Sequence, residues 1–233
     1  MENLEKLKQW VADSRQIVFF GGAGVSTESG IRDFRSVDGL YSQKFDYPPE
    51  TIISHSFYLK NPEYFFRFYR EKMLPLGHEP NITHKKLAQW EREGKLAAVV
   101  TQNIDGLHQK AGSKTVYELH GSVLRNYCTR CGKFYPAEFI RDTPGIPRCT
   151  CGGIVKPDVV LYEEALDQQT LENSVCAIRN ADMLPHMTIR QIWFCMKVLV
   201  RYFPTFNMKN EGCRRENRQP SLYLLYGMAD YGL

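Results

Sequence analysis

A short apolar segment that ends in a glycine-rich turn is the feature that most constrains the fold of this chain. Residues 17–20 are apolar and residues 21–24 read GGAG, after a start with apolar residues at helical spacing over residues 2–14. Glycines at such a turn let backbone N–H groups approach a pyrophosphate. An ordinary tight turn fits the same residues, since Thr27 stands where the dinucleotide-binding fingerprint has its third glycine.

Strands that alternate with helices predict the fold class. Residues 96–101 form a second apolar strand, and a helix over residues 83–93 precedes it, with Thr83 as N-cap and Gly94 at its end. A further strand is predicted over residues 158–162. This order favours an α/β chain built on a parallel sheet.

Four cysteines in two close pairs indicate a metal site. The cluster interrupts the α/β pattern, and a closed set of four thiolates at this separation is typical of a structural zinc ribbon. A redox dithiol is the alternative, although two pairs leave no open position for catalysis. The zinc ligands are predicted to be Cys128, Cys131, Cys149 and Cys151, and packing roles are expected for Cys176, Cys195 and Cys213.

The charge distribution argues against a nucleic-acid partner. The net charge is +4, yet residues 1–184 hold 23 Lys/Arg and 23 Asp/Glu, so the excess lies in residues 185–233, with 7 against 3. No apolar run of about 18 residues predicts a membrane span, and the charged start does not resemble a secretion signal. Reduced cysteines and the absence of such a signal favour a cytoplasmic protein.

Three further segments carry a resemblance to a known family. They are residues 21–36, residues 101–108 (TQNIDGLH) and residues 118–122 (ELHGS). In order and spacing they resemble the signature motifs of the sirtuins, a family of NAD-dependent protein-lysine deacylases, and the resemblance is to the bacterial type. The four-cysteine insert and residues 156–160 (KPDVV) also resemble segments of this family. The resemblance covers about residues 1–184. It implies a Rossmann-like parallel sheet with a smaller zinc-ribbon and helical domain.

The resemblance also assigns a site. His120 would be the general base that deprotonates a ribose hydroxyl, which suits a side chain that titrates near neutral pH, whereas a hydrogen-bonded structural histidine is the alternative without the motif. Ile104, Asp105 and Phe34 would hold the nicotinamide carboxamide, and Gln102 would lie on the ribose side. The predicted NAD-binding residues are Gly22, Ala23, Gly24, Thr27, Phe34, Arg35, Gln102, Asn103, Ile104 and Asp105.

The family's substrate is an acyl-lysine protein or peptide, which pairs with an extended segment of the enzyme. Val159, Val160 and Tyr162 are the corresponding residues here. Sirtuins that prefer acidic acyl groups carry a tyrosine and, three residues on, an arginine. The nearest counterpart is Tyr69 with Lys72, so an acetyl or other neutral acyl group is favoured. The products would be nicotinamide and O-acetyl-ADP-ribose.

The last 49 residues depart from the family. The predicted domains are a Rossmann-like domain (1–40, 80–125 and 156–184), a small domain (41–79 and 126–155) and an atypical tail (185–233). The tail has no GTS segment, so C-terminal strands of the sheet and part of the NAD site are expected to be missing. A change of reading frame near Leu184 is one hypothesis, and a natural divergent tail is the alternative. A further departure is Arg32, where sirtuins have a proline, and it predicts a looser cofactor loop.

The alternatives to an active deacetylase therefore stay open. A catalytically impaired sirtuin remnant would act only as an NAD- or peptide-binding protein. A zinc-ribbon interaction module and an ADP-ribosyl transferase are the remaining possibilities.

Overall fold

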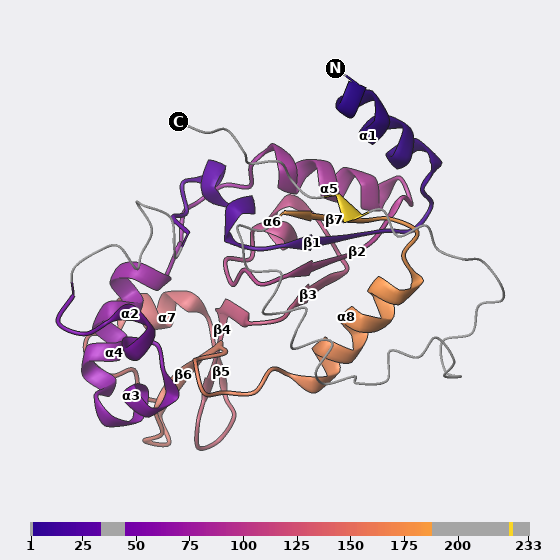
Figure 1. Cartoon of the computed structure of the whole chain (residues 1–233). Coiled ribbons are helices and arrows are strands. Elements are labelled where there is room, and N and C mark those ends of the chain that lie inside the picture. The colour runs from indigo at the N-terminus through magenta and orange to yellow at the C-terminus, as the bar shows by residue number, and fades with distance from the viewer. Residues whose placement is uncertain (1, 34–44, 188–223, 226–233) are drawn as a thin grey trace.

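The computed structural model describes residues 2–33, 45–187 and 224–225. A five-stranded sheet with the order β3-β2-β1-β7-β8 forms its larger part (Figure 1). Every pair of neighbours in this sheet is parallel, as predicted for an α/β fold. The strands are β1 (Ile17–Gly21), β2 (Leu96–Thr101), β3 (Val116–Glu118), β7 (Leu184–Met187) and β8 (Leu224–Leu225).

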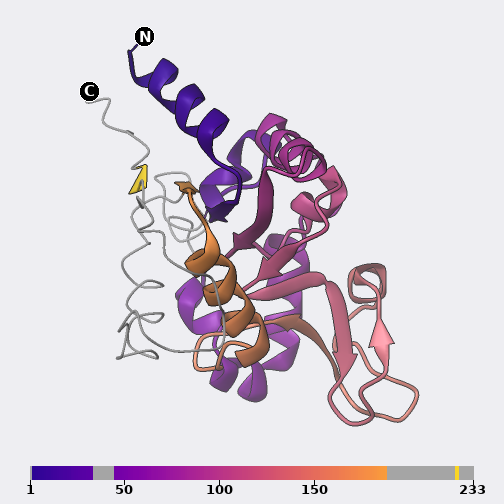
Figure 2. The ribbon, with the colours of Figure 1, turned by 90° about the vertical axis from the view of Figure 1, so that its right-hand side faces the viewer.

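Helices cover both faces of the sheet, which is why its central strands read as continuous apolar runs. Alternate residues of β1 and β2 enter two different clusters: Val18 and Val100 pack with α8, whereas Phe19 and Val99 pack with residues of α1 and α5. Figure 2 shows the sheet between α5 and α8. The helices are α1 (Glu2–Asp13), α5 (Ile82–Arg92), α6 (Leu107–Ala111) and α8 (Gln168–Asn180).

A second, smaller unit combines short helices with a three-stranded antiparallel sheet of order β5-β4-β6. Its core is rich in aromatic rings that meet edge to face, such as Tyr58 with Phe65 and Phe65 with Phe66. Its elements are α2 (Pro49–Ile52), α3 (His55–Lys60), α4 (Pro62–Phe68), the π-helix η4 (Tyr69–Met73), β4 (Gly121–Cys128), β5 (Phe134–Tyr135), α7 (Ala137–Asp142) and β6 (Val155–Val159).

Two predicted elements differ from the observed ones. The N-cap of α5 is Asn81 and not Thr83, because the Asn81 side chain accepts from Thr83 N and His84 N while His84 Nδ1 accepts from Asn81 N. The predicted strand over residues 158–162 ends at Val159, and it lies in the small antiparallel sheet. The predicted domain boundaries remain a prediction. In the structure β4 and β6, which lie at two of these boundaries, both belong to the smaller sheet.

Candidate active site and metal site

The glycine turn lies at the carboxyl end of β1, where the fold brings it against β2. Gly21 O accepts from Gln102 N at 2.9 Å, and a Cβ on Gly21 would lie 2.8 Å from the Phe19 ring. Two short 3-10 helices follow, η1 (Ala23–Val25) and η2 (Thr27–Ser29), so the turn does not open a long α-helix. Thr27 Oγ1 donates to Gly24 O and fixes the turn.

A hydrogen-bond network joins this turn to the loop after β2. Ser26 Oγ donates to Asp105 Oδ2 at 2.7 Å, and Asn103 Nδ2 donates to Ser26 Oγ at 3.0 Å. Asp105 Oδ1 accepts from Leu107 N at 2.9 Å, which ties the carboxylate to the start of α6. Asp105 and Asn103, two of the predicted NAD-binding residues, thus bond to the same hydroxyl, although they lie 79 and 77 positions from Ser26 in the sequence. Sequence reasoning gave Ser26 no role, since its contacts are long-range.

His120 lies beside the same loop, and its tautomer follows from its neighbour. His120 Nδ1 is 3.0 Å from the carbonyl oxygen of Gln102, which can only accept, so Nδ1 carries the proton and Nε2 keeps its lone pair. Burial lowers the pKa of His120 from its ordinary value, although the bond to the Gln102 carbonyl acts in the opposite direction. At neutral pH the ring is therefore in the form that accepts a proton.

The residue after His120 has to be glycine. Gly121 has φ +74°, and a Cβ there would overlap the carbonyl oxygen of Asp158. This close approach lets His120 O accept from Val160 N at 3.0 Å. The backbone of the predicted base is thus bonded to the predicted substrate segment.

A buried pair of histidines lies near Asp105. His84 and His108 are 0% and 1% exposed, with ring centroids 4.6 Å apart. His84 Nε2 and both ring nitrogens of His108 have no hydrogen-bond partner among the described residues. Burial, and secondly His84, lowers the pKa of His108 to about 3. Burial also lowers the pKa of His84, so the pair is uncharged at neutral pH.

The NAD assignment fits the donors and acceptors at the loop after β2. Gln102 Nε2 is buried and has no hydrogen-bond partner among the described residues, so it is a donor available to a polar ligand. Asp105 and Ser26 supply the acceptor and hydroxyl that an amide and a ribose need. Phe34 and Arg35 fall outside the described residues, as does most of the predicted cofactor loop after the exposed Arg32.

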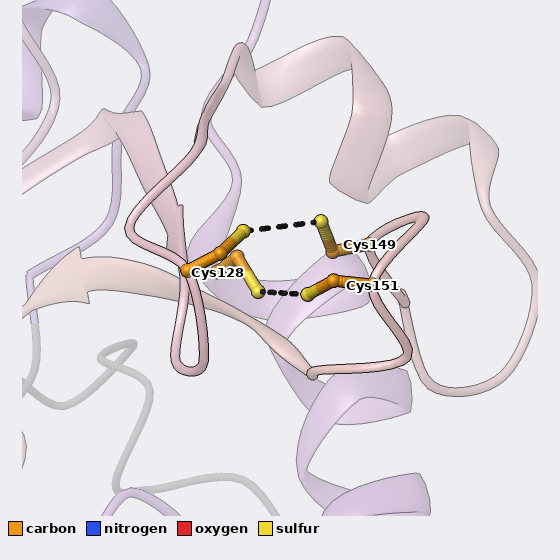
Figure 3. A group of neighbouring side chains, drawn as sticks. Cys128, Cys149 and Cys151 are labelled. Carbon is orange, nitrogen blue, oxygen red and sulfur yellow. Dashed lines mark hydrogen bonds between the residues drawn. The ribbon is translucent and has the colours of Figure 1, made fainter.

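The four predicted zinc ligands come together in the small unit (Figure 3). All four Sγ atoms lie within 4.8 Å of one another, with Cys128–Cys151 at 3.4 Å and Cys131–Cys149 at 3.6 Å. A tetrahedral zinc with Zn–S bonds of about 2.3 Å places its sulfurs roughly 3.8 Å apart, whereas a disulfide needs about 2.05 Å. The donor set therefore fits zinc and not two disulfides.

Local structure explains how a C-x-C pair closes this site. A Cβ on Gly153 would lie 2.7 Å from Cys128 Sγ, so only glycine allows the second loop to approach this closely. Hydrogen bonds from the Cys151 backbone N–H and then from the Tyr135 hydroxyl lower the pKa of Cys149 to about 5. This favours the thiolate, the form that binds metal.

The predicted substrate segment begins on β6 and continues beyond it. Val159 is the last residue of β6, whereas Val160 and Tyr162 follow the strand, with Tyr162 paired to Ser54 as an isolated parallel bridge. Tyr162 is 44% exposed. Tyr69 is buried in the core of the small unit, and Lys72 pairs with Glu71, so neither extends free into solvent.

These features define a class of protein: an α/β protein with a Rossmann-like parallel sheet and a small unit built around a four-cysteine metal site. Known proteins agree. The family model described as Sir2 family matches residues 22–188. An "NAD-dependent protein deacetylase" of Clostridium acetobutylicum is 56% identical over 207 residues, which cover 87% of this chain and 84% of that protein. The protein of the same name from Listeria monocytogenes is 43% identical, with 78% and 77% covered.

Solved structures of Sir2 proteins are also similar to this chain. A Sir2 structure with deacetylated p53 peptide and 3'-O-acetyl ADP-ribose has a TM-score of 0.76 at 34% identity, covering 85% of this chain and 82% of that one. A Sir2–p53 peptide–NAD+ structure has a TM-score of 0.73 at 36% identity, covering 85% and 82%. The chain belongs to the Sir2 family. No helix among the described residues has the length and apolar character that crossing a bilayer requires.

Proposed function

We propose that this chain is an NAD-dependent protein-lysine deacetylase that releases nicotinamide and O-acetyl-ADP-ribose. The observation that carries the proposal is the placement of His120. Its protonated Nδ1 is bonded to Gln102 O, and its backbone carbonyl is bonded to Val160 N, so a proton acceptor lies between the loop after β2 and the substrate segment. Relatives named NAD-dependent protein deacetylase support the activity.

Each residue of the proposed active site has a separate role. Asp105, fixed by Ser26 Oγ and Leu107 N, accepts the amide N–H of the nicotinamide group, and Gln102 Nε2 donates to the ribose side. His120 Nε2 takes the proton of a ribose hydroxyl. When bound, NAD supplies the ribose carbon that receives the acyl oxygen as nicotinamide leaves. The four cysteines hold a structural zinc and take no part in the chemistry.

The substrate is an acyl-lysine protein or peptide that pairs with the backbone at Val159, Val160 and Tyr162. Backbone pairing demands little of the neighbouring sequence. A neutral acyl group such as acetyl fits, since the described residues place no arginine three positions after Tyr69, where Lys72 pairs with Glu71. The proposal extends to a cytoplasmic location, because thiolates that bind zinc persist in a reducing compartment.

A specific observation favours a second candidate, an impaired remnant that only binds its ligands. The family match ends at residue 188, and beyond β7 the described part of the sheet adds only the two residues of β8. The carboxyl end of a parallel sheet is where a dinucleotide binds, so the tail has to complete this edge for full activity.

One experiment separates the candidates. Purified protein is incubated with an acetyl-lysine peptide, with and without NAD, while peptide mass and nicotinamide release are followed, and His120→Ala is the control. We expect loss of the acetyl group that requires NAD and vanishes in the variant. No turnover in folded, zinc-loaded protein would reject the deacetylase and leave the binding-only remnant.

A further inference from the structure

The backbone of residues 160–162, the part of the predicted substrate segment beyond β6, is held by two backbone carbonyls and one carboxylate. Residues 160–162 lie beyond the end of β6, yet each of their N–H groups has an acceptor within the protein. Val160 N donates to His120 O at 3.0 Å, Leu161 N donates to Glu164 Oε2 at 2.9 Å, and Tyr162 N donates to Ile53 O at 3.1 Å. The acceptors thus come from three places: the predicted base, the link from α2 to α3, and the carboxylate of Glu164.

Three donors from different parts of the chain converge on that carboxylate. Besides Leu161 N, Lys156 Nζ from β6 lies 3.1 Å from Glu164 Oε2, and His55 Nδ1 from the start of α3 lies 2.8 Å from Oε1. Lys156 Nζ also donates to Val159 O at 3.1 Å. The Glu164 side chain is only 20% exposed, so these bonds are partly shielded from water and from salt.

Glu164 stays ionised in this environment. Burial works to raise its pKa, but the Leu161 N–H, His55 and Lys156 together lower the pKa below its ordinary value. The turn itself is closed by Glu164 N, which donates to Leu161 O at 3.1 Å. The same residue therefore fixes both sides of the turn that ends the substrate segment.

The adjacent glutamate makes different contacts. Glu163 has φ +77°, a conformation that side chains rarely adopt, and its carboxylate accepts from Ser56 N at 2.9 Å and Ser56 Oγ at 3.0 Å. Both contacts are to Ser56 on α3, and neither involves the substrate segment. Glu163 thus provides a matched comparison, with the same charge and the same turn.

We infer that Glu164 is a positioning residue for the acyl-lysine substrate. Glu164 accepts hydrogen bonds from Leu161 N and from Lys156 on β6, and it thereby fixes the position of residues 160–162 where the peptide pairs. The inference rests on the proposed function, because it takes these residues as the place where the peptide pairs.

The test compares Glu164→Ala, Glu164→Gln and Glu163→Gly in the full chain. For Glu164→Ala we expect the KM for an acetyl-lysine peptide to rise about tenfold, which is close to the effect of losing one hydrogen bond to a charged group. We expect kcat and the KM for NAD to stay within about twofold. Glu164→Gln keeps one acceptor oxygen and should have an intermediate effect. Glu163→Gly removes the same charge and should change the peptide KM less than about threefold.

A merely structural role gives a different result. It would lower the Tm and the zinc content of Glu164→Ala and change both KM values and kcat together. That outcome, an unchanged peptide KM, or an equal effect of Glu163→Gly would overturn the inference. An inactive wild-type protein would reject the proposed function instead, and the affinity for a fluorescent acetyl-lysine peptide, measured by anisotropy, would still decide the role of Glu164. In that assay Glu164→Ala should bind about tenfold more weakly, and equal binding by both proteins would overturn the inference.

Discussion

At the scale of single residues, Gly121 sets the geometry of the site because it allows two backbones to touch. Its positive φ and the carbonyl of Asp158 both exclude a side chain. Gly94 also has a positive φ of +72°, but a Cβ there would meet nothing within 4 Å. The two glycines therefore separate the effect of conformation from the effect of crowding.

Gly121→Ala should lower the free energy of unfolding by about 3 kcal/mol or more, since the left-handed conformation and the overlap with Asp158 add together. Gly94→Ala should lower it by only about 1 kcal/mol, the effect of conformation alone. Urea denaturation followed by circular dichroism measures both. Equal losses in the two variants would mean that the backbone at Gly121 moves away at little cost.

His108 predicts how stability depends on pH. Because its pKa is lowered to about 3 in the folded chain, the unfolded chain, with an ordinary histidine pKa near 6.5, binds more protons between these values. Its contribution to stability is therefore present above about pH 6.5 and decreases as the pH falls, by up to about 1.4 kcal/mol per pH unit. His108→Gln should reduce the slope of unfolding free energy against pH. An unchanged slope would show that His108 is protonated without cost.

Much of the candidate site could be predicted at this scale. Gln102, Asn103 and Asp105 belong to one contiguous motif, and His120 from the next motif bonds to Gln102. The four cysteines of the two close pairs also meet. The partnership of Ser26 with Asp105, and the pairing of His84 with His108, could not be predicted, since both depend on how separate elements pack.

At the scale of elements, the start of α5 shows why capping positions are difficult to predict. Both Asn81 and Thr83 are good N-cap residues, and only the backbone decides between them. Asn81 has an extended conformation and a capping box with His84, and its Nδ2 also donates to Val25 O at 2.7 Å. The cap thus connects α5 to the end of η1, beside the cofactor turn.

Asn81→Ala should lower the free energy of unfolding by about 1–2 kcal/mol, because the first N–H groups of α5 lose their acceptor and Val25 O loses a donor. Asn61 provides the control: it is the N-cap of α4 but makes no side-chain cap bond. Asn61→Ala should change stability by less than about 0.5 kcal/mol. Similar losses in thermal or urea unfolding of both variants would contradict this assignment of the cap.

The sequence of β6 contains the alternating pattern of an antiparallel strand, but the apolar run that follows it dominated the prediction. Residues 155–159 alternate between buried and partly exposed side chains, as in a half-exposed antiparallel strand, whereas the apolar run 159–162 favoured the strand predicted over residues 158–162. Pro157 agrees with the observed edge position in the order β5-β4-β6. The run after Val159 is apolar for another reason, because Leu161 packs into the core of the small unit.

At the scale of the whole molecule, the metal site and the aromatic core of the small unit are one structure. Cys128 and Cys149 are buried members of the same cluster as Phe65 and Phe66. The parallel sheet has clusters of its own on its two faces, and their described members include none of the four clustered cysteines. The sequence could predict both units, but the pairing of β4 with β6 within the small unit needed the fold.

Removal of zinc should therefore loosen the small unit before the parallel sheet. Four thiolates without a metal repel one another or take up protons, and the bonds that close the site are lost. With a zinc chelator present, amide hydrogen exchange should accelerate in β4, β6 and α7, while β1 and β2 remain protected because their cores do not contain the site. Cys149→Ser should give the same pattern without chelator.

Two other exchange patterns would count against this division of the molecule. Simultaneous loss of protection in both units would mean that they unfold as one cooperative body. No change in either unit would mean that the aromatic core suffices without metal. The second result would also mean that the cysteines have a purpose other than structural zinc, because their thiolates would then contribute nothing to the stability of the unit that holds them.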